Sequence, residues 1–366
     1  MKCLKLMHYI GRIGLLPIVM MSVGLYLGFS VCSSLRSLGI TFTIWHTPVK
    51  HVSWPDVKLF GTSETHYTGG EDAVAQDLAR KVKVLCWIMT GPKSHDRAQH
   101  VKATWGRRCN ILLFMSTEHD RSLPTVKLSV REGYHYLWGK TKQAMKYVYD
   151  HHLQRADWFF KADDDTYAVM ENLRYMLSAF NTSDPLYFGL RYKRFVRNGY
   201  MSGGAGYVLS REALKRFVER ALPDKDSCKQ DDTGPEDLEL GECLQNVGVH
   251  SVDTRDSFGR GRFFHFLPER YIIPHHMASD FWYWSYIYYS FTPGFSCCSD
   301  TAVTFHYVSQ SQMHVLEYLI YQLRPYGVSH RFKGKPGFTE PAVTELQEPW
   351  WNRLMAALWL TRTHTA

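Results

Sequence analysis

The sequence predicts one large α/β domain with a largely parallel sheet, set behind an N-terminal membrane anchor. Apolar runs typical of buried strands alternate with helical segments between about residues 81 and 190. The 366 residues are 45% hydrophobic and 14% aromatic, which is enough apolar material for a substantial core. An uncharged apolar stretch near the N-terminus indicates the anchor.

The anchor is expected at residues 13–35, because no charged residue lies between Arg12 and Arg36. A helix of this length can cross the ~30 Å hydrocarbon core of a bilayer. Basic residues lie mostly before the run, so residues 1–12 should form a cytoplasmic tail and the rest should lie across the membrane. A cleaved signal peptide is the alternative, but the run is long for one and has no clear A-x-A site.

Three further regions follow the anchor. Residues 36–80 are rich in Pro, Gly, Ser and Thr and read as a stem, with a short helix expected near 72–80. Residues 81–330 carry the strand and helix patterns and should form the folded domain. Residues 331–366 change character, and their apolar segment "WWNRLMAALWL" is too short to span a bilayer.

Charge and cysteine content narrow the function class. The net charge of +8 favours anionic ligands, but no dense Lys/Arg stripe exists, so no nucleic-acid binding is expected. Six of the eight cysteines lie in the body, and an even number in an exported domain suggests disulfides, with 15 pairings open. The absence of a C-x-x-C pair disfavours a zinc ribbon. Asn181 begins a glycosylation sequon, which fits a lumenal body.

The expected elements place an acidic triplet at the end of a strand. Strands are expected at 81–90, 110–116, 157–162 and 185–190, and helices at 96–108, 140–153 and 166–180. In parallel sheets of this type, ligands bind beyond the carboxyl ends of the strands. The triplet "DDD" follows the third strand directly, so it should lie at such an edge.

The triplet consists of Asp163, Asp164 and Asp165. In an extended segment Asp163 and Asp165 point the same way, so they could form an oxygen site for Mg²⁺ or Mn²⁺ that also bridges phosphates. The alternative is that Asp165 caps the helix expected at 166–180 while its neighbours lie in solvent. The two roles can coexist.

Two other segments could contribute chemistry. Glu236 and Asp237 begin an expected helix, where they either suit the helix dipole or supply a general base. Gly203, Gly204 and Gly206 match neither a dinucleotide-binding nor a P-loop motif. These glycines allow either a close approach of the backbone to a ligand or a plain tight turn.

Aromatic residues dominate the segment "FWYWSYIYYSF" at 281–291. Such a cluster is either core or a stacking platform for sugar rings. His306 lies between two aromatic residues further on. It is either a core histidine or, within reach of the aspartates, a third metal ligand.

Together these segments resemble the core 1 β1,3-galactosyltransferase family, enzymes that extend O-linked GalNAc on Ser or Thr. The resemblance spans about residues 80–328 and is carried, in order, by "CWIMTGP", "HVKATWGRRCN", "DWFFKADDDTY", "GYMSGGAGYVLSREALKRF", "EDLELGECL", "FWYW", "CCSD", "FHYV" and "YLIYQLRPYG". It implies a GT-A fold, Mn²⁺ as cofactor, UDP-galactose as donor, glycoprotein acceptors bearing GalNAc-Ser/Thr, and a single inverting displacement. It further implies a homodimer and a type II protein of the Golgi membrane.

The resemblance also implies residue roles. Asp163, Asp165 and His306 would bind the metal, and Asp237 would be the catalytic carboxylate that takes the proton from the acceptor 3-OH. The implied contacts to the UDP-sugar are Met89, Glu132, Gly133, Lys140, Lys161, Asp163 and Asp164. The implied acceptor contacts are Trp282 and Tyr283. The implied disulfides are Cys86–Cys109, Cys228–Cys243 and Cys297–Cys298.

The sequence departs from the family pattern in two places. Tyr134 stands where the family often has Arg, and Tyr cannot make bidentate phosphate contacts. Arg270 and Tyr271 replace histidines of a "PEHH" motif. The departures suggest a diverged paralogue, and they leave open a non-catalytic, chaperone-like member or a transferase with another sugar or acceptor. Retention of the acidic motif, the base and His306 favours an enzyme.

Overall fold

The computed structural model describes residues 73–323 and residue 325. The expected cytoplasmic tail, the anchor at 13–35, most of the stem and the C-terminal tail at 331–366 lie outside these residues. In the described part of the chain, no helix is both long enough and apolar enough to cross a membrane. The short helix expected at the end of the stem is present as α3 (Ala73–Lys81).

The described residues contain a central seven-stranded sheet with the strand order β10-β6-β9-β4-β1-β2-β3. Its strands are β1 (Val84–Met89), β2 (Ile111–Ser116), β3 (Thr125–Lys127), β4 (Trp158–Asp163), β6 (Leu186–Gly189), β9 (Tyr207–Ser210) and β10 (His250–Ser251). Neighbouring strands are parallel except that β9 runs antiparallel to both β4 and β6. The mixed α/β architecture expected from the sequence is therefore confirmed, with one reversed strand in the middle.

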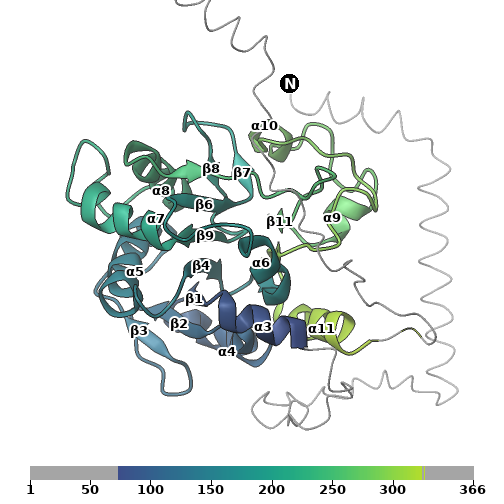
Figure 1. Ribbon diagram of the computed structural model, residues 1–366, viewed down its shortest axis with the longest axis horizontal. Coiled ribbons are helices and arrows are strands. Elements are labelled where there is room, and N and C mark those ends of the chain that lie inside the picture. The colour runs from purple at the N-terminus through teal and green to yellow at the C-terminus, as the bar shows by residue number, and fades with distance from the viewer. Residues whose placement is uncertain (1–72, 324, 326–366) are drawn as a thin grey trace, which may run out of the picture. The chain divides into compact units, whose positions relative to one another are not determined.

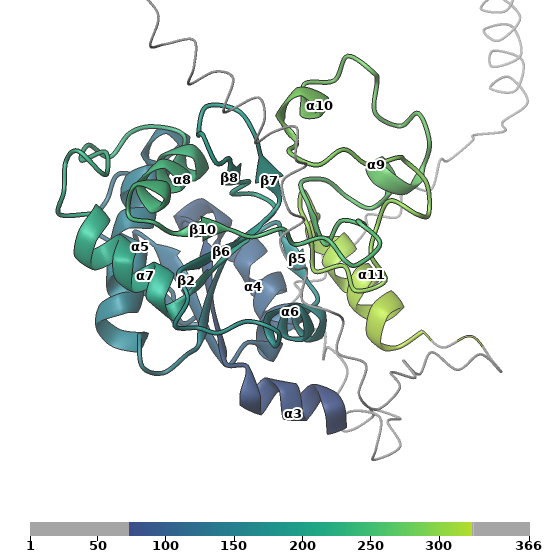
Figure 2. The same cartoon turned by 45° about the horizontal axis from the view of Figure 1, so that its top comes forward.

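Helices cover both faces of this sheet (Figures 1 and 2). One face carries α5 (Leu137–His152), α7 (Arg211–Arg216) and α8 (Glu236–Asn246), and the other carries α4 (His95–Ala103), α6 (Met170–Leu177) and α11 (Gln310–Tyr321). All six side chains of β1 are buried and alternate between two hydrophobic clusters. Because successive side chains of a strand point to opposite faces, a strand buried on both faces reads as a continuous apolar run, as β1 does.

A smaller region packs beside the main sheet. It contains the three-stranded sheet β11-β12-β5, built from β11 (Phe263–Phe264), β12 (Thr304–Phe305) and β5 (Tyr167–Ala168). It also contains the hairpin of β7 (Arg191–Tyr192) and β8 (Tyr200–Met201), and the short helices α9 (Glu269–Ile272) and α10 (Tyr283–Tyr286). A third hydrophobic cluster, mostly aromatic, holds these pieces together.

The helix expected at 166–180 begins later than the sequence indicates. Tyr167 and Ala168 form β5, which pairs antiparallel with β12, and α6 starts at Met170. A partner strand about 137 positions along the chain takes the first residues of the segment, so local pattern could not predict the shift. The sequence also did not predict β9. This strand pairs with β4 and β6, which both come earlier in the chain, so local pattern does not show its partners.

Candidate functional site

The acidic triplet lies where the carboxyl ends of β1 and β4 meet. Met89, the last residue of β1, is paired in register with Asp163, the last residue of β4. The chain leaves the sheet at this point, so Asp164 and Asp165 lie directly beyond its edge. The sequence correctly placed the triplet at a strand end, where a ligand can approach open backbone.

Asp163, Asp165 and His306 form a group that could hold a metal ion. One ligand atom from each lies within 4.8 Å of the others. The Nε2 atom of His306 is 3.1 Å from Asp165 Oδ1 and 3.8 Å from Asp163 Oδ2. The Nδ1 atom of the same ring faces the carbonyl oxygen of His265 at 3.3 Å, which leaves Nε2 toward the carboxylates. Two carboxylates and one imidazole suit a divalent ion such as Mn²⁺.

The structure rules out the helix-cap interpretation of Asp165. The residue at the N-cap of α6 is Val169, four positions beyond Asp165. Asp163 and Asp165 converge on His306, the residue after β12, as expected. The expected extended segment is absent, because Asp164 and Asp165 lie in a turn closed by the hydrogen bond from the Thr166 N–H to the Asp163 carbonyl (3.1 Å).

Asp164 points to different partners. Thr90 Oγ1 donates a hydrogen bond of 2.7 Å to one carboxylate oxygen, and Arg97 Nη1 approaches the other at 3.2 Å. Burial raises the pKa of Asp164 to about 6, against the opposing effects of Thr90 and Arg97. Arg97 also lies 3.8 Å from Asp165. Its cationic head therefore faces the triplet, a role that its place in the sequence did not reveal.

Lys161 binds the first aspartate of the triplet. Its side chain is almost fully buried, and its Nζ donates hydrogen bonds to Asp163 Oδ1 (2.5 Å) and to the carbonyl oxygen of Gly203 (3.0 Å). Burial acts to lower the pKa of Lys161, but the carboxylates of Asp163 and Glu236 outweigh it, so the net shift is upward. Lys161 thus remains charged and neutralises part of the acidic group.

The backbone of the glycine segment at 203–206 passes close to His306 and Glu236. A Cβ atom at Gly204 would lie 2.3 Å from His306 Cε1, and one at Gly203 would lie 2.8 Å from Glu236 Oε2. Gly206 has a φ of 78°, which favours glycine. These glycines let the 203–206 loop pass directly beneath the histidine and both carboxylates of the "ED" pair.

Glu236 and Asp237 have different surroundings in the structure. Glu236 is buried, and its Oε1 accepts hydrogen bonds from Thr141 Oγ1 (2.9 Å) and Tyr207 OH (2.6 Å). Asp237 is half-buried, and its oxygens accept from the backbone N–H groups of Gly203 (3.1 Å) and Leu238 (3.0 Å). Burial raises the pKa of both carboxyls. Asp237 is the more accessible of the two and is held in a fixed orientation.

The expected donor residues lie around the same edge. Lys140 is buried and donates hydrogen bonds to Glu132 Oε1 (2.8 Å) and to the carbonyl oxygen of Thr90, the residue that also contacts Asp164. Gly133 has a φ of 121° and leads into the short helix η4 (Tyr134–Tyr136). Met89 is buried at the end of β1. The side chain of Tyr134 is 80% exposed.

The two expected acceptor residues differ in exposure. Trp282 is 41% exposed, whereas Tyr283 is 1% exposed and accepts a hydrogen bond from Tyr271 OH at 3.2 Å. Direct contact with an acceptor is thus open to Trp282 in this structure, whereas Tyr283 belongs to the aromatic core. The ring of His265, which the sequence did not single out, lies between Trp282 and His306, with centroid distances of 5.5 Å and 5.3 Å.

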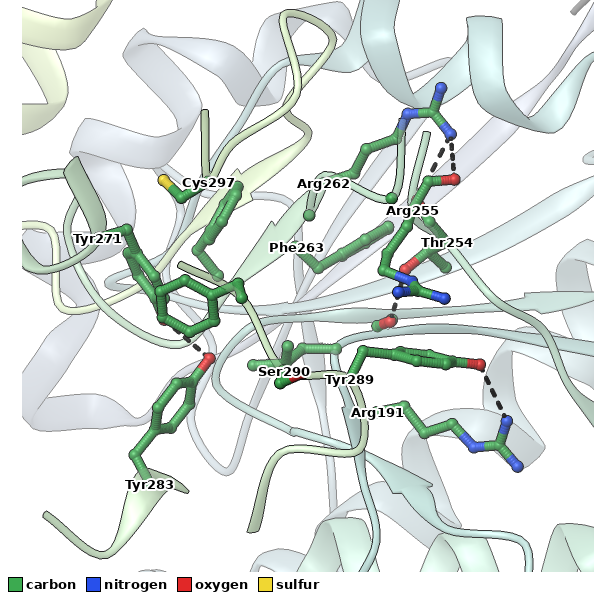
Figure 3. A pocket seen from close by; sticks show the side chains of 16 residues that line it. Arg191, Thr254, Arg255, Arg262, Phe263, Tyr271, Tyr283, Tyr289, Ser290 and Cys297 are labelled. Atoms are coloured by element: carbon green, nitrogen blue, oxygen red, sulfur yellow. Dashed lines mark hydrogen bonds between the residues drawn. The ribbon is translucent and has the colours of Figure 1, made fainter. Parts of the chain in front are cut away.

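A hollow is lined in part by this aromatic region (Figure 3). Arg191, Arg255 and Arg262 line it together with Tyr271, Tyr283 and Tyr289. Figure 3 shows the hydroxyls of Tyr271 and Tyr283 directed toward each other and Arg191 directed toward Tyr289. None of the three metal-group residues lines this hollow, and its polar groups are largely paired with one another.

The disulfides agree with expectation. Cys86–Cys109, Cys228–Cys243 and Cys297–Cys298 are all bonded, which confirms the three pairings. Asn181 is exposed in the turn after α6. Of the family departures, Tyr271 fills the aromatic core and donates to Tyr283, while Arg270 donates to the carbonyl of His276 at 3.2 Å.

The chain is similar in sequence to known glycosyltransferases. The Fringe-like family matches residues 81–259. Glycoprotein-N-acetylgalactosamine 3-beta-galactosyltransferase 1 of Xenopus laevis is 45% identical over 291 residues, covering 78% of this chain and 80% of that protein. Human beta-1,3-glucosyltransferase is 30% identical over 207 residues, covering 56% of this chain and 40% of that protein.

Among solved structures, a glycosyltransferase involved in the glycosylation of the major capsid of PBCV-1 aligns with 11% identity and a TM-score of 0.33, over 65% of this chain and 100% of that one. The assignment does not depend on it. The match to the Xenopus protein, at 45% identity over 78% of this chain, shows the family. The chain belongs to the glycoprotein-N-acetylgalactosamine 3-beta-galactosyltransferase family.

Proposed function

We propose that this protein is an inverting galactosyltransferase that moves galactose from UDP-galactose to the 3-OH of GalNAc linked to Ser or Thr of glycoproteins. The observation that carries the proposal is the meeting of the Asp163–Asp165–His306 group, Lys161 and Asp237 around one glycine loop. The name of the Xenopus relative supports the choice of acceptor and transferred sugar. The fold that the proposal assigns is GT-A.

The three ligand atoms fit a divalent cation, and Mn²⁺ is the ion we propose. Their mutual distances of up to 4.8 Å need only a small inward shift to reach a common ion. When bound, Mn²⁺ would offset the negative charge that builds on the UDP leaving group. Lys161, already bonded to Asp163, would hold that carboxylate in its ligating orientation.

The proposed reaction is a single displacement at C1 of galactose. The acceptor 3-OH oxygen attacks C1 as the bond from C1 to the UDP oxygen breaks, and the hydroxyl proton passes to Asp237. A raised pKa suits a carboxylate that must accept a proton, and the backbone N–H groups of Gly203 and Leu238 fix its direction. Glu236, bonded to Thr141 and Tyr207, supports the start of α8 rather than the proton transfer.

The donor would lie along the carboxyl edge of β1 and β4. Arg97 faces Asp164 and Asp165 from α4, and Lys140 lies on the far side of Thr90. We propose that these two cations stand in for the arginine that Tyr134 replaces, with Arg97 closest to the diphosphate. Thr90 links the two sides, because its hydroxyl donates to Asp164 and its carbonyl accepts from Lys140.

Location and assembly belong to the same proposal. A type II anchor at residues 13–35 would hold the folded domain in the Golgi lumen, where disulfides persist. Three disulfides and an exposed sequon support a lumenal domain. The expected homodimer is retained as part of the proposal.

One assay tests the function. The full chain in detergent is incubated with UDP-galactose, a GalNAc-Thr glycopeptide and Mn²⁺, and transfer is followed by mass spectrometry. We expect one hexose added to the glycopeptide, and none when Mn²⁺ is replaced by a chelator. Absence of transfer together with absence of UDP binding by calorimetry would contradict the enzyme, and transfer from another UDP-sugar alone would contradict the donor.

A further inference from the structure

The hairpin loop between β7 and β8 carries an unusual surface, which we call the 193–197 loop and define as Lys193, Arg194, Phe195, Val196 and Arg197. Lys193, Arg194, Phe195 and Arg197 are exposed, while Val196 is buried. Within the described residues, no carboxylate lies at ion-pair distance from any of the three cations. Exposed cations without acidic partners, grouped on one short loop, favour an anionic partner.

The loop is held rigidly although it is exposed. The backbone N–H of Lys193 donates to the carbonyl of Tyr286 (2.8 Å), and that of Asn198 donates to the side chain of Gln245 on α8 (2.8 Å). Val196 is a buried anchor in the aromatic cluster. These contacts fix the hairpin beside α10, as both Figures 1 and 2 show.

Phe195 adds a second, independent observation. Its φ is 70°, a conformation that is strained for a bulky side chain, and its ring is 68% exposed. A strained, exposed aromatic residue contributes nothing evident to the core. Such strain persists where the surroundings impose it, and it is common at ligand-binding surfaces.

A continuous series of ring contacts joins the 193–197 loop to the metal group. From His306 the series runs to His265 (5.3 Å between centroids), Trp282 (5.5 Å) and Tyr286 (5.3 Å). Tyr286 then contacts Phe195 (6.0 Å), and the guanidinium of Arg194 lies 5.1 Å from the Tyr286 ring centre. The loop is therefore the outer end of a series of ring contacts that starts at the buried His306 and passes through Trp282, which is 41% exposed.

From this arrangement we infer that the 193–197 loop binds the polypeptide part of the acceptor and selects glycopeptides with Asp or Glu near the glycosylated residue. The inference rests on the proposed function. The acceptor sugar lies inward near Trp282, which leaves the peptide to pass outward over Tyr286 and Phe195. Carboxylates on that peptide meet the three exposed cations of the loop, and Phe195 offers an apolar contact.

The test uses two dye-labelled GalNAc-Thr glycopeptides that differ only in having Asp and Glu or Asn and Gln at the flanking positions. Binding to the full chain with UDP and Mn²⁺ is measured by fluorescence anisotropy, and kcat/KM by galactose transfer. We expect the acidic peptide to bind roughly tenfold more tightly at low salt, with most of the preference lost at high salt. Substituting Lys193→Gln, Arg194→Gln and Arg197→Gln together should reduce the preference to about twofold or less.

A control variant loses the same number of positive charges at another place on the protein. Lys215, Arg220 and Lys225 are exposed on and just after α7, and their triple replacement by Gln removes the same three charges elsewhere. This control should retain the preference, and both triple variants should transfer galactose to benzyl-α-GalNAc like the wild type. Equal binding of the two peptides by the wild type, or equal loss in the control, would overturn the inference.

The binding measurement separates this inference from the proposed function. If galactose is not transferred but the acidic peptide still binds through the 193–197 loop, the function fails and the docking surface stands. If transfer occurs without charge preference, the function stands and the docking surface fails. Loss of binding to phosphatidylserine vesicles in the loop variant, with peptide binding unchanged, would identify a membrane contact and also overturn the inference.

Discussion

At the residue scale, neighbouring carboxylates in this protein have different environments. Asp163 and Asp165 meet His306, whereas Asp164 between them turns to Thr90 and Arg97. Glu236 is buried and accepts hydrogen bonds from two hydroxyl groups, whereas Asp237 accepts them from backbone N–H groups. A turn after β4, closed by the hydrogen bond from the Thr166 N–H to the Asp163 carbonyl (3.1 Å), accounts for the first separation, and the start of α8 accounts for the second.

Replacing Asp237 by Asn should abolish turnover without disturbing donor binding. The amide keeps the size and the contact with Gly203 but cannot accept the proton, so we expect kcat to fall by about 10²–10⁴-fold. Calorimetry with UDP and Mn²⁺ should give an unchanged Kd. The matched control is Glu236→Gln, which should keep kcat within about tenfold; a larger loss there than at Asp237 would reverse the assignment.

Replacing Gly204 by Ala should weaken metal binding. The new methyl carbon would lie 2.3 Å from His306 Cε1, so the imidazole must move away from the carboxylates. We expect Mn²⁺ affinity to drop by about 10–100-fold, measured by electron paramagnetic resonance of free Mn²⁺. The melting temperature is recorded alongside. Unchanged Mn²⁺ affinity in a folded variant would show that His306 is not a ligand.

At the element scale, α11 is docked by a buried ionic cluster. Glu317 on this helix accepts hydrogen bonds from Arg107 (2.6 Å), Arg108 (2.7 Å) and Tyr167 OH (2.8 Å). Tyr167 belongs to β5, the strand directly after the acidic triplet. The cluster therefore ties α11 and the short 3-10 helix η3 (Trp105–Arg108), which follows α4, to the segment that carries the expected metal ligands.

Replacing Glu317 by Gln should lower the free energy of unfolding by about 3 kcal/mol at neutral pH, because two arginines lose their buried counterion. Burial opposes ionisation, but Arg108, Tyr167 and Arg107 outweigh it and hold the pKa of Glu317 below its usual value. The stabilisation is thus present above the ordinary Glu pKa and is lost as pH falls through the depressed folded value. The difference between variant and wild type should shrink below about pH 4 in urea titrations.

The control for this experiment is Glu118→Gln, at an exposed position without an ion pair in the described residues. It should change stability by less than about 0.5 kcal/mol at any pH. A Glu317 effect as small as that of Glu118, or one that grows on acidification, would contradict the role given to the cluster.

At the scale of the whole molecule, the proposed topology puts the folded domain in the lumen. Asn181 is exposed and begins a sequon, so a lumenal domain should carry a glycan there. Glycosidase treatment of the full chain from animal cells should reduce its apparent mass by one step, and Asn181→Gln should remove that step. An unglycosylated wild-type chain that stays in the cytosol would refute the proposed topology.

The sequence by itself determined the alternating strands and helices, the strand end that presents the triplet, and the two acidic motifs. These features are local: periodic burial of β1 and β4, and residue types whose chemistry is recognisable wherever they lie. Motif resemblance added the role of His306 and the three disulfide pairings, which spacing alone left open.

Only the tertiary structure decided which alternative holds at each site. The cap role of Asp165 was excluded because β12 captures residues 167 and 168, and a partner so distant leaves no local signal. The burial of Tyr283, the approach of Arg97 to the triplet and the ring series from His306 to Phe195 likewise join segments far apart in the chain. Contacts of this kind depend on long-range packing, which single-sequence periodicity does not encode.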